Sequence, residues 1–321
     1  MISGEYVVLD GAVALVAAVD ARAVVRWVWN DDGSPPARHG SPGSSTLPPE
    51  VLLTKSLAEA FTRMTSTTDS LALDVSALRR GARKLGLGSS AAAAAATAGA
   101  VFARAGRDLG AASERRAMLD LALEGHRSVA PEGSGADVAA SVLGGLVRFQ
   151  RDAESGAVLE ATPVAFPAGT EVRVVWTGHE ARTSDLVRLV RGLAETDRAA
   201  YERAMGALRD AAALLCEAVA ANDAAALVRA TSVHHDAMAR LGEASGAPIV
   251  EAGLAQAATL ARKHGGAAKP SGAGGGDVAL AFFADADSAN AFAGECPAHG
   301  LDLVTVTLGA EGVREHREIS L

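Results

Sequence analysis

The sequence predicts a protein of two domains, each of which combines α-helices with β-strands. Its 321 residues are enough for two domains with sizeable cores, because single domains usually contain about 100–200 residues. Short β-branched and apolar runs that predict strands alternate with longer stretches of helical periodicity. A polar, turn-rich stretch at residues 151–170 separates two such groups. We therefore expect domains at residues 1–165 and 166–321.

The composition indicates a globular protein from a reducing compartment. Hydrophobic residues make up 49% of the chain and charged residues 21%, as in soluble proteins. The net charge of −8 argues against binding to nucleic acid or anionic membranes, which requires basic surface. Cys216 and Cys296 are too few for a disulfide scaffold. We expect a cytoplasmic protein without a signal peptide or membrane span, and its state as a monomer or homodimer stays open.

In the first half of the chain, strands precede helices. Strands are expected at residues 6–9, 13–19, 24–29, 71–78 and 145–150, the first three of them forming a meander with a turn at Asp10-Gly11. A loop rich in Gly, Pro and Ser is expected at residues 31–49. Helices are expected at residues 52–64, 89–105, 113–125 and 138–143.

The second half is dominated by helices. Strands are expected at residues 172–177, 278–283 and 303–308. Residues 184–264 have helical character with breaks near Thr196, Asn222 and Gly246, and another helix is expected at residues 285–296. Within this half, His234, His235 and Asp236 are adjacent on a helix and point in different directions, without HxxxH or HExxH spacing, so we interpret them as structural.

The stretch RKLGLGSSAAAAAATAGA, at residues 83–100, joins a glycine loop to the start of an alanine-rich helix. The first N–H groups of a helix have no intrahelical partner, and the helix dipole adds partial positive charge there, so an anion such as a phosphate is favoured. Glycines let the backbone approach such a ligand closely. By itself the stretch also fits a serine-capped buried helix, and it matches neither GxxxxGK[ST] nor GxGxxG.

Two further glycine-rich stretches contain chemically useful side chains. GHRSVAPEGSGADVAASVLGG, at residues 125–145, places Asp137 in the first turn of a predicted helix. Such an aspartate is often only a favourable N-terminal charge, but a positioned carboxylate can also orient or deprotonate a nucleophile in phosphoryl transfer. KPSGAGGGD, at residues 269–277, precedes an apolar strand. Its successive N–H groups can hold a phosphate, and the alternative is a low-complexity linker.

Segments spread over nearly the whole chain resemble, in the same order, the motifs of the GHMP kinases, the superfamily of galactokinase, homoserine kinase and mevalonate kinase. They look most like the phosphomevalonate kinase branch. The segments are GEYVVLDGAVALVAAVD from Gly4, KLGLGSSAA from Lys84, GSGADVAAS from Gly133, WTGHEART from Trp176 and KPSGAGGGD from Lys269.

The resemblance implies a fold and an activity. The fold is α+β, with an N-terminal α+β domain, a C-terminal ferredoxin-like α+β domain and the active site in the cleft between them. The activity is transfer of phosphate from ATP, with Mg²⁺, to (R)-5-phosphomevalonate. Alternatives are mevalonate or another small acceptor, or a nucleotide-binding pseudo-kinase. The pseudo-kinase is an alternative because the family's Pro-Gly-Lys strand does not precede the first motif here. Either the natural start lies upstream of Met1, or the lysine of that strand is lost.

The resemblance also assigns roles to individual residues. Asp137 is expected beside the acceptor oxygen, and Lys84 and Lys269 are expected to neutralise phosphate charge. Ser90 and Glu124 are expected to bind Mg²⁺, although the alignment could confuse Glu124 with its neighbour His126. The residues expected at the ATP phosphates are Gly86, Leu87, Gly88, Ser89, Ser90 and Ala91. Those expected at the acceptor are Glu5, Tyr6, Ser134, Arg182, Thr183, Lys269, Ser271, Gly272 and Ala273. Arg182 replaces a small residue of the family, and either binds phosphate or faces solvent.

Overall fold

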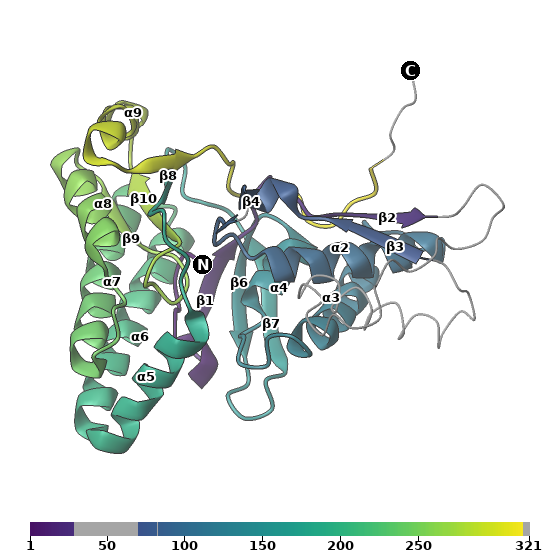
Figure 1. Cartoon of the computed structure of the whole chain (residues 1–321), viewed down its shortest axis with the longest axis horizontal. Coiled ribbons are helices and arrows are strands. Elements are labelled where there is room, and N and C mark those ends of the chain that lie inside the picture. Colours follow the sequence, from purple (N-terminus) through teal and green to yellow (C-terminus); the bar gives the residue numbers. More distant parts are fainter. Residues whose placement is uncertain (29–69, 82, 317–321) are drawn as a thin grey trace.

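The computed structural model describes residues 1–28, 70–81 and 83–316, which form two α+β domains side by side (Figure 1). The predicted loop at residues 31–49 and the predicted helix at residues 52–64 lie outside the described residues. The predicted boundary between residues 165 and 166 falls in the connection between strands β7 and β8, and it stays a prediction.

The N-terminal domain is built on a three-stranded antiparallel sheet in the order β1-β6-β7. Helix α4 packs against this sheet, and helices α2 and α3 pack against α4 and against each other. The alanine-rich faces of α2 and α4 allow close helix packing. The bounds are β1 Ala14–Ala17, β6 Leu146–Arg151, β7 Val158–Val164, α2 Ser89–Arg104, α3 Ala112–Arg127 and α4 Ala136–Leu143. The three helices confirm the sequence predictions.

Two smaller antiparallel pairs extend this domain. Strand β2 pairs with β3, and β4 pairs with β5 to form a short hairpin that leads into the glycine loop before α2. Their bounds are β2 Val24–Val28, β3 Ser70–Asp74, β4 Arg79–Arg80 and β5 Arg83–Lys84. Strand β3 ends early because the Asp74 carboxylate accepts a hydrogen bond from the Ser76 amide at 2.8 Å, which starts the 3₁₀ turn Ser76–Leu78.

The C-terminal domain is a four-stranded antiparallel sheet in the order β11-β8-β10-β9. With helices between β8 and β9 and between β10 and β11, this order is that of a ferredoxin-like βαββαβ sandwich, as predicted. The bounds are β8 Glu171–Trp176, β9 Ala267–Pro270, β10 Val278–Phe283, β11 Asp302–Val304, α5 Thr183–Thr196, α6 Arg198–Ala220, α7 Ala224–Ser245, α8 Ala252–Lys263 and α9 Ala286–Glu295. The four helices from α5 to α8 occupy one side of the domain (Figure 1).

Three predictions about strands were wrong. Residues Val7–Asp10 form a 3₁₀ helix, because Gly4 and Tyr6 have positive φ angles and the Val8 amide bonds the Gly4 carbonyl at 2.9 Å. The apolar pattern there reflects burial rather than a strand. Strand β2 pairs with β3 and not with β1, so the predicted meander does not form. Strand β7 was missed, since it is a half-buried edge strand that contains Pro163.

The domains are joined by a shared hydrophobic core. Ile2, Leu15 and Leu146 of the N-terminal half pack in one cluster with Val174 and Leu280 of the C-terminal sheet. All five side chains are nearly inaccessible to solvent. Because this apolar surface is buried between the domains, the cleft above it has a fixed floor.

After β11, the chain returns to the N-terminal domain, as the yellow segment in Figure 1 shows. The Gly309 amide donates to the Ala18 carbonyl at 2.8 Å, and the Val313 amide donates to Val142 at 3.2 Å. Arg22 adds hydrogen bonds to the carbonyls of Glu311 and Gly312. This returning segment is a second connection between the domains.

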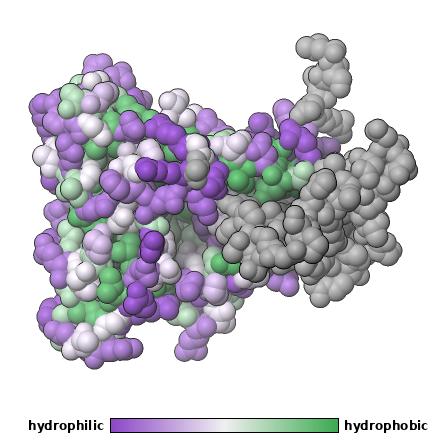
Figure 2. Space-filling model, viewed as in Figure 1, coloured by the Kyte–Doolittle hydropathy of each residue, from purple (hydrophilic) through white to green (hydrophobic). Residues whose placement is uncertain are grey.

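In the view of Figure 2, hydrophilic and hydrophobic residues are interspersed over the helical C-terminal domain. No helix within the described part of the chain is both long and apolar enough to span a membrane.

The returning segment makes a testable prediction at Gly312. A Cβ atom there would lie 2.2 Å from the Val142 carbonyl oxygen and 2.7 Å from the Gly144 nitrogen, and backbone atoms on both sides leave little room for movement. Gly312→Ala is expected to lower the free energy of unfolding by about 1–3 kcal/mol in urea denaturation. Gly206→Ala is the control, because that glycine lies inside α6 with open space around its Cβ position. Equal stability of the two variants would contradict the packing described.

Candidate active site

A cleft with a volume of about 1130 Å³ lies between the two domains. It is lined by the first residues of the chain, the glycine loop before α2, the start of α4 and the loop between β9 and β10. Segments that are distant in sequence therefore meet at one cavity. The predicted site residues that line it are Glu5, Tyr6, Lys84, Gly86, Leu87, Gly88, Ser89, Ser90, Ser134, Asp137, Thr183, Ser271, Gly272 and Ala273.

The N-terminus of α2 opens into the cleft. Gly88 precedes the helix with φ of 76°, and Gly86 has φ of 71°, a left-handed conformation that glycine adopts without steric cost. Ser89 and Ser90 occupy the first turn and line the cavity, and Ala91 is buried directly behind them. The free N–H groups and the dipole of this helix end favour an anion at this position.

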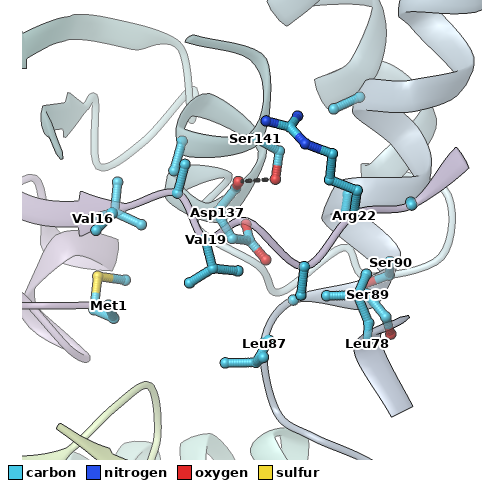
Figure 3. A pocket seen from close by; sticks show the side chains of 18 of the residues that line it. Met1, Val16, Val19, Arg22, Leu78, Leu87, Ser89, Ser90, Asp137 and Ser141 are labelled. Atoms are coloured by element: carbon cyan, nitrogen blue, oxygen red, sulfur yellow. Dashed lines mark hydrogen bonds between the residues drawn. The ribbon is translucent and has the colours of Figure 1, made fainter. Parts of the chain in front are cut away.

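Asp137 lies beside the same helix end, next to Gly88. It lies in the first turn of α4, is half-buried, and a Cβ atom on Gly88 would lie 3.9 Å from its carboxylate. Figure 3 shows the carboxylate pointing toward the space between Leu87 and Ser89. The Ser141 hydroxyl donates to the Asp137 carbonyl at 2.9 Å, which fixes the turn that presents the side chain.

The hairpin before the glycine loop connects to the C-terminal domain. The Lys84 backbone amide donates to the Glu180 carboxylate at 2.6 Å, and the Arg83 guanidinium donates to the Gly178 carbonyl at 2.9 Å. Lys84 itself is half-buried and lines the cleft. The glycine loop is therefore held against the loop that follows β8.

Asp277 is a cleft residue to which the sequence analysis assigned no role. It has φ of 54°, accepts a hydrogen bond from the Ala181 amide at 3.2 Å, and lies so close to Gly86 that a Cβ there would be 2.4 Å from the Asp277 Cβ. Burial raises the pKa of Asp277, and the nearby Glu180 carboxylate raises it further. The hydrogen bond from the Ala181 amide lowers this pKa, but its effect is smaller than that of burial. In the sequence, only its position directly after three glycines could have indicated that Asp277 belongs to the site. In the structure, Asp277 connects the glycine loop before α2 with the glycine loop before β10.

Lys269 is not among the residues that line the cleft, and its contact with the acceptor stays a prediction. Its side chain is completely buried, and Nζ donates to Glu5 Oε1 at 2.5 Å and to the Pro270 carbonyl at 2.6 Å. A lysine before a glycine loop is a pattern typical of a phosphate site. The pattern gives no sign that the buried Glu5 carboxylate, far away in the sequence, pairs with this lysine. Glu5, in contrast, is at the cleft wall.

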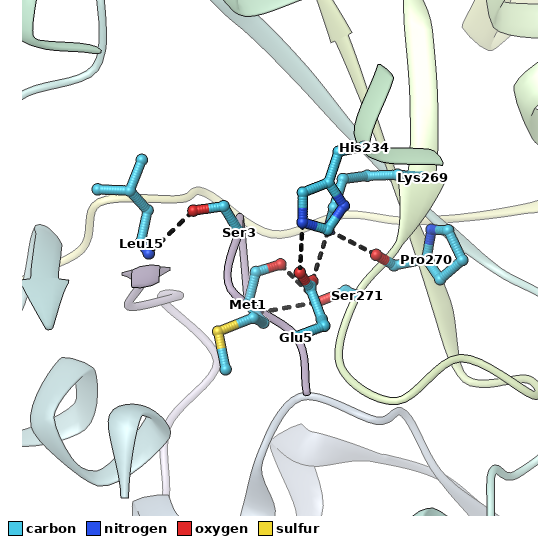
Figure 4. A network of polar contacts seen from close by, with 8 residues as sticks. All are labelled: Met1, Ser3, Glu5, Leu15, His234, Lys269, Pro270 and Ser271. Atoms are coloured by element: carbon cyan, nitrogen blue, oxygen red, sulfur yellow. Dashed lines mark hydrogen bonds and ion pairs between the residues drawn. The ribbon is translucent and has the colours of Figure 1, made fainter. Parts of the chain in front are cut away.

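His234 completes this buried cluster, which Figure 4 shows. Its Nε2 lies 3.2 Å from Glu5 Oε2, and neither side chain has appreciable exposure. Burial lowers the pKa of His234 to about 3, so the ring is neutral near pH 7. Burial would raise the pKa of Glu5, but the charge of Lys269, together with His234, holds it below its usual value. Within the described residues, no three His, Cys, Asp or Glu side chains are grouped so that they could hold a metal ion. His234 instead contacts the Glu5 carboxylate, which the sequence pattern does not connect with it.

Two other predicted residues lie away from the cavity. Arg182 and Glu124 are exposed, and neither lines the cleft. The side chain beside Ser90 belongs to His126, whose Nε2 lies 3.2 Å from the serine Oγ. The arrangement thus places His126, rather than Glu124, next to the predicted metal-binding serine.

Comparisons with known proteins identify the family of both halves of the chain. The family description "GHMP kinases N terminal domain" matches residues 53–145, and "GHMP kinases C terminal" matches residues 199–301. A phosphomevalonate kinase from Streptomyces sp. (strain CL190) is 28% identical over 329 residues, covering 88% of this chain and 87% of that protein.

Solved structures share the fold over almost the full length of the chain. The Lin0012 protein from Listeria innocua superimposes with a TM-score of 0.82 at 21% identity, covering 98% of this chain and 97% of its own. Streptococcus pneumoniae phosphomevalonate kinase in complex with phosphomevalonate and AMPPNP gives a TM-score of 0.76 at 20% identity, with 96% of each chain covered. L. major mevalonate kinase in complex with R-mevalonate gives 0.70 at 20% identity, covering 97% and 94%.

The buried histidine makes a prediction about stability and pH. Unfolded His234 has a pKa near 6.5, whereas the folded value is about 3. Below pH 6.5 the unfolded chain therefore binds a proton that the folded chain does not, and this group lowers the free energy of unfolding by about 1.4 kcal/mol per pH unit until the pH approaches 3. The full contribution is present above pH 6.5.

Urea unfolding at about pH 7.5, 6.5 and 5.5 measures this effect. The variant His234→Leu lacks the titrating group, so its stability is expected to fall less steeply on acidification than that of the unchanged protein. Identical slopes for both proteins would contradict this account, because they would show that His234 binds its proton equally well in the folded and unfolded chains.

Proposed function

Because the chain belongs to the GHMP kinase superfamily, we propose that it transfers the terminal phosphate of ATP to (R)-5-phosphomevalonate, giving 5-diphosphomevalonate and ADP. The observation that carries this proposal is the placement of Asp137 opposite the glycine loop and N-terminus of α2 in one interdomain cleft. The choice of acceptor is supported by the 28% identical phosphomevalonate kinase, which aligns with 88% of this chain.

The α2 end of the cleft fits the phosphates of ATP. Gly86 and Gly88 leave the backbone accessible, and the helix end supplies unpaired N–H donors. Lys84 lines the same cavity and can neutralise phosphate charge. These groups act by alignment and by charge stabilisation, which are the main contributions to catalysis of phosphoryl transfer.

The residues present also fit Mg²⁺, which prefers oxygen ligands. The Ser90 hydroxyl and the Asp137 carboxylate both line the cleft and would hold the ion, which would neutralise charge on the transferred phosphate. Glu124 is exposed outside the cleft, so its part in binding Mg²⁺ stays a prediction.

The protein's own contribution at the reacting oxygen comes from Asp137. The terminal phosphate oxygen of 5-phosphomevalonate is already anionic, so little proton removal is needed. Asp137 therefore orients this oxygen toward ATP more than it deprotonates it. With an alcohol as acceptor, the same carboxylate would instead act as a general base.

One observation favours mevalonate as a second candidate acceptor. The charge of Lys269 is neutralised by Glu5 behind the cleft wall, so this predicted cation is not available to an acceptor phosphate in the conformation described. A pseudo-kinase that binds nucleotide without turnover is the remaining alternative.

Turnover with defined acceptors distinguishes these functions. Purified protein with MgATP is expected to release ADP with 5-phosphomevalonate and to release little with mevalonate or homoserine, because the cleft aligns an anionic acceptor without requiring a strong base. A coupled assay for ADP provides the measurement. Turnover with mevalonate alone would replace the proposed acceptor, and silence with all three despite measurable ATP binding would favour the pseudo-kinase.

Asp137→Asn tests the role of the carboxylate. The variant is expected to lose at least about tenfold in kcat, because the amide keeps the size of the side chain and removes its charge. Asp120→Asn is the matched control, since Asp120 is an exposed residue of α3 whose ion pair among the described residues is a surface contact with Arg116. A loss of less than tenfold in folded Asp137→Asn would contradict the assigned role.

A further inference from the structure

The cluster of Glu5, Lys269 and His234 joins three separate parts of the chain. Glu5 precedes the first 3₁₀ helix, His234 lies in the middle of α7, and Lys269 lies in β9. The three side chains meet with exposures of 0–1%, and in Figure 4 the histidine and the lysine both approach the glutamate. Of the three, only Glu5 lines the cleft.

Two hydrogen-bonded contacts beside the cluster join the same segments at the cleft wall. The Tyr6 hydroxyl donates to the Ala273 carbonyl at 2.5 Å. The Ser271 hydroxyl donates to the Met1 carbonyl at 3.1 Å. The loop Ser271–Ala273 is therefore attached to residues 1–6 at two points, and the four residues that form these contacts line the cleft.

We propose that Lys269 and His234 are positioning residues that fix Glu5, and through it the loop Ser271–Ala273, at the acceptor end of the cleft. They contact neither ligand. They determine how well the acceptor is held and leave the ATP end, formed by the glycine loop and α2, unchanged. The identity of the acceptor in this proposal rests on the proposed function, whereas the effect on the loop does not.

The incomplete hydrogen bonding of the cluster supports a functional role. The contact between His234 and Glu5 is close, but Glu5 Oε2 and both ring nitrogens of His234 lack a hydrogen bond of good geometry. Buried polar atoms without partners are rare and costly, and apolar side chains commonly replace buried ion pairs without loss of stability. A cluster kept only for stability would not need these groups.

The charges of the cluster indicate a positional effect. The ammonium of Lys269 and the carboxylate of Glu5 neutralise each other at 2.5 Å, and the ring of His234 is neutral. The cluster therefore adds no net charge to the cleft wall. Its influence on an anionic acceptor comes from where it places the Ser271–Ala273 backbone, because small displacements of a bound reactant reduce the rate strongly.

A pair of histidine variants tests the proposal. His234→Leu removes the group that contacts Glu5, whereas His235→Leu is a matched control, because His235 is also buried on α7 and has no contact with Glu5. For His234→Leu, KM for the acceptor is expected to rise about tenfold or more, with KM for ATP within about twofold of the unchanged protein. His235→Leu is expected to change neither. Equal rises in both KM values for His234→Leu would show a general structural role and overturn the proposal.

The variant Glu5→Gln/Lys269→Met separates positioning from the penalty of an unpaired buried charge. Removing one partner alone leaves a buried charge and can prevent folding, but the double change removes both charges together. The double variant is expected to fold and still show the raised KM for the acceptor. A folded double variant with unchanged KM for the acceptor would contradict the proposal.

Hydrogen exchange supplies a readout that does not depend on turnover. Backbone amides of residues 271–276 are expected to exchange at least about tenfold faster in His234→Leu than in His235→Leu, because Glu5 is then less firmly held and residues 1–6, to which the loop is hydrogen-bonded, become more mobile. Unchanged exchange in both variants would overturn the proposal even if the true acceptor is not 5-phosphomevalonate. A different result separates the two proposals. If the protein without substitutions does not turn over 5-phosphomevalonate, but exchange of residues 271–276 is faster in His234→Leu than in His235→Leu, the proposed function fails and the positioning role stands.

Discussion

The ion pair between Glu5 and Lys269 is the contact on which the acceptor end of the proposed site depends. Two charges removed from water are tolerable only when each neutralises the other, so the first six residues of the chain are tied to β9 of the C-terminal domain. The shared core of Ile2, Leu15 and Val174 lies in the same region. Together these contacts keep two domains in one arrangement, and the cleft between them keeps its shape.

Close approaches of backbone explain why the functional segments are rich in glycine. Any side chain at Gly86 would collide with Asp277, and any side chain at Gly274 would collide with the Ile249 carbonyl oxygen, 2.2 Å from its Cβ position. The first contact joins the loop before α2 to the loop before β10, and the second joins that loop to the chain before α8. Glycine is therefore needed at these positions to build the cleft, beyond any contact with a phosphate.

The sequence predicted the helices of the described residues from 83 onward and the ferredoxin-like domain, because helical periodicity is a local pattern, and most of the site residues proposed from its glycine-rich stretches line the cleft. It failed where long-range partners decide the structure. Residues 6–9 look like a strand, but the positive φ angles of Gly4 and Tyr6 turn them into a 3₁₀ helix. Lys269 looks like a phosphate ligand, but a carboxylate 264 residues away pairs with it. No pattern in a single sequence connects Glu5 with His234 or with Lys269.

The most direct test of this account is a crystal structure with Mg²⁺, a non-hydrolysable ATP analogue and 5-phosphomevalonate. The account predicts the nucleotide phosphates at the N-terminus of α2, the acceptor phosphate between Asp137 and the loop Ser271–Ala273, and Lys269 still paired with Glu5 behind the cleft wall. An acceptor bound elsewhere, or Lys269 released from Glu5 and in contact with the acceptor phosphate, would contradict it.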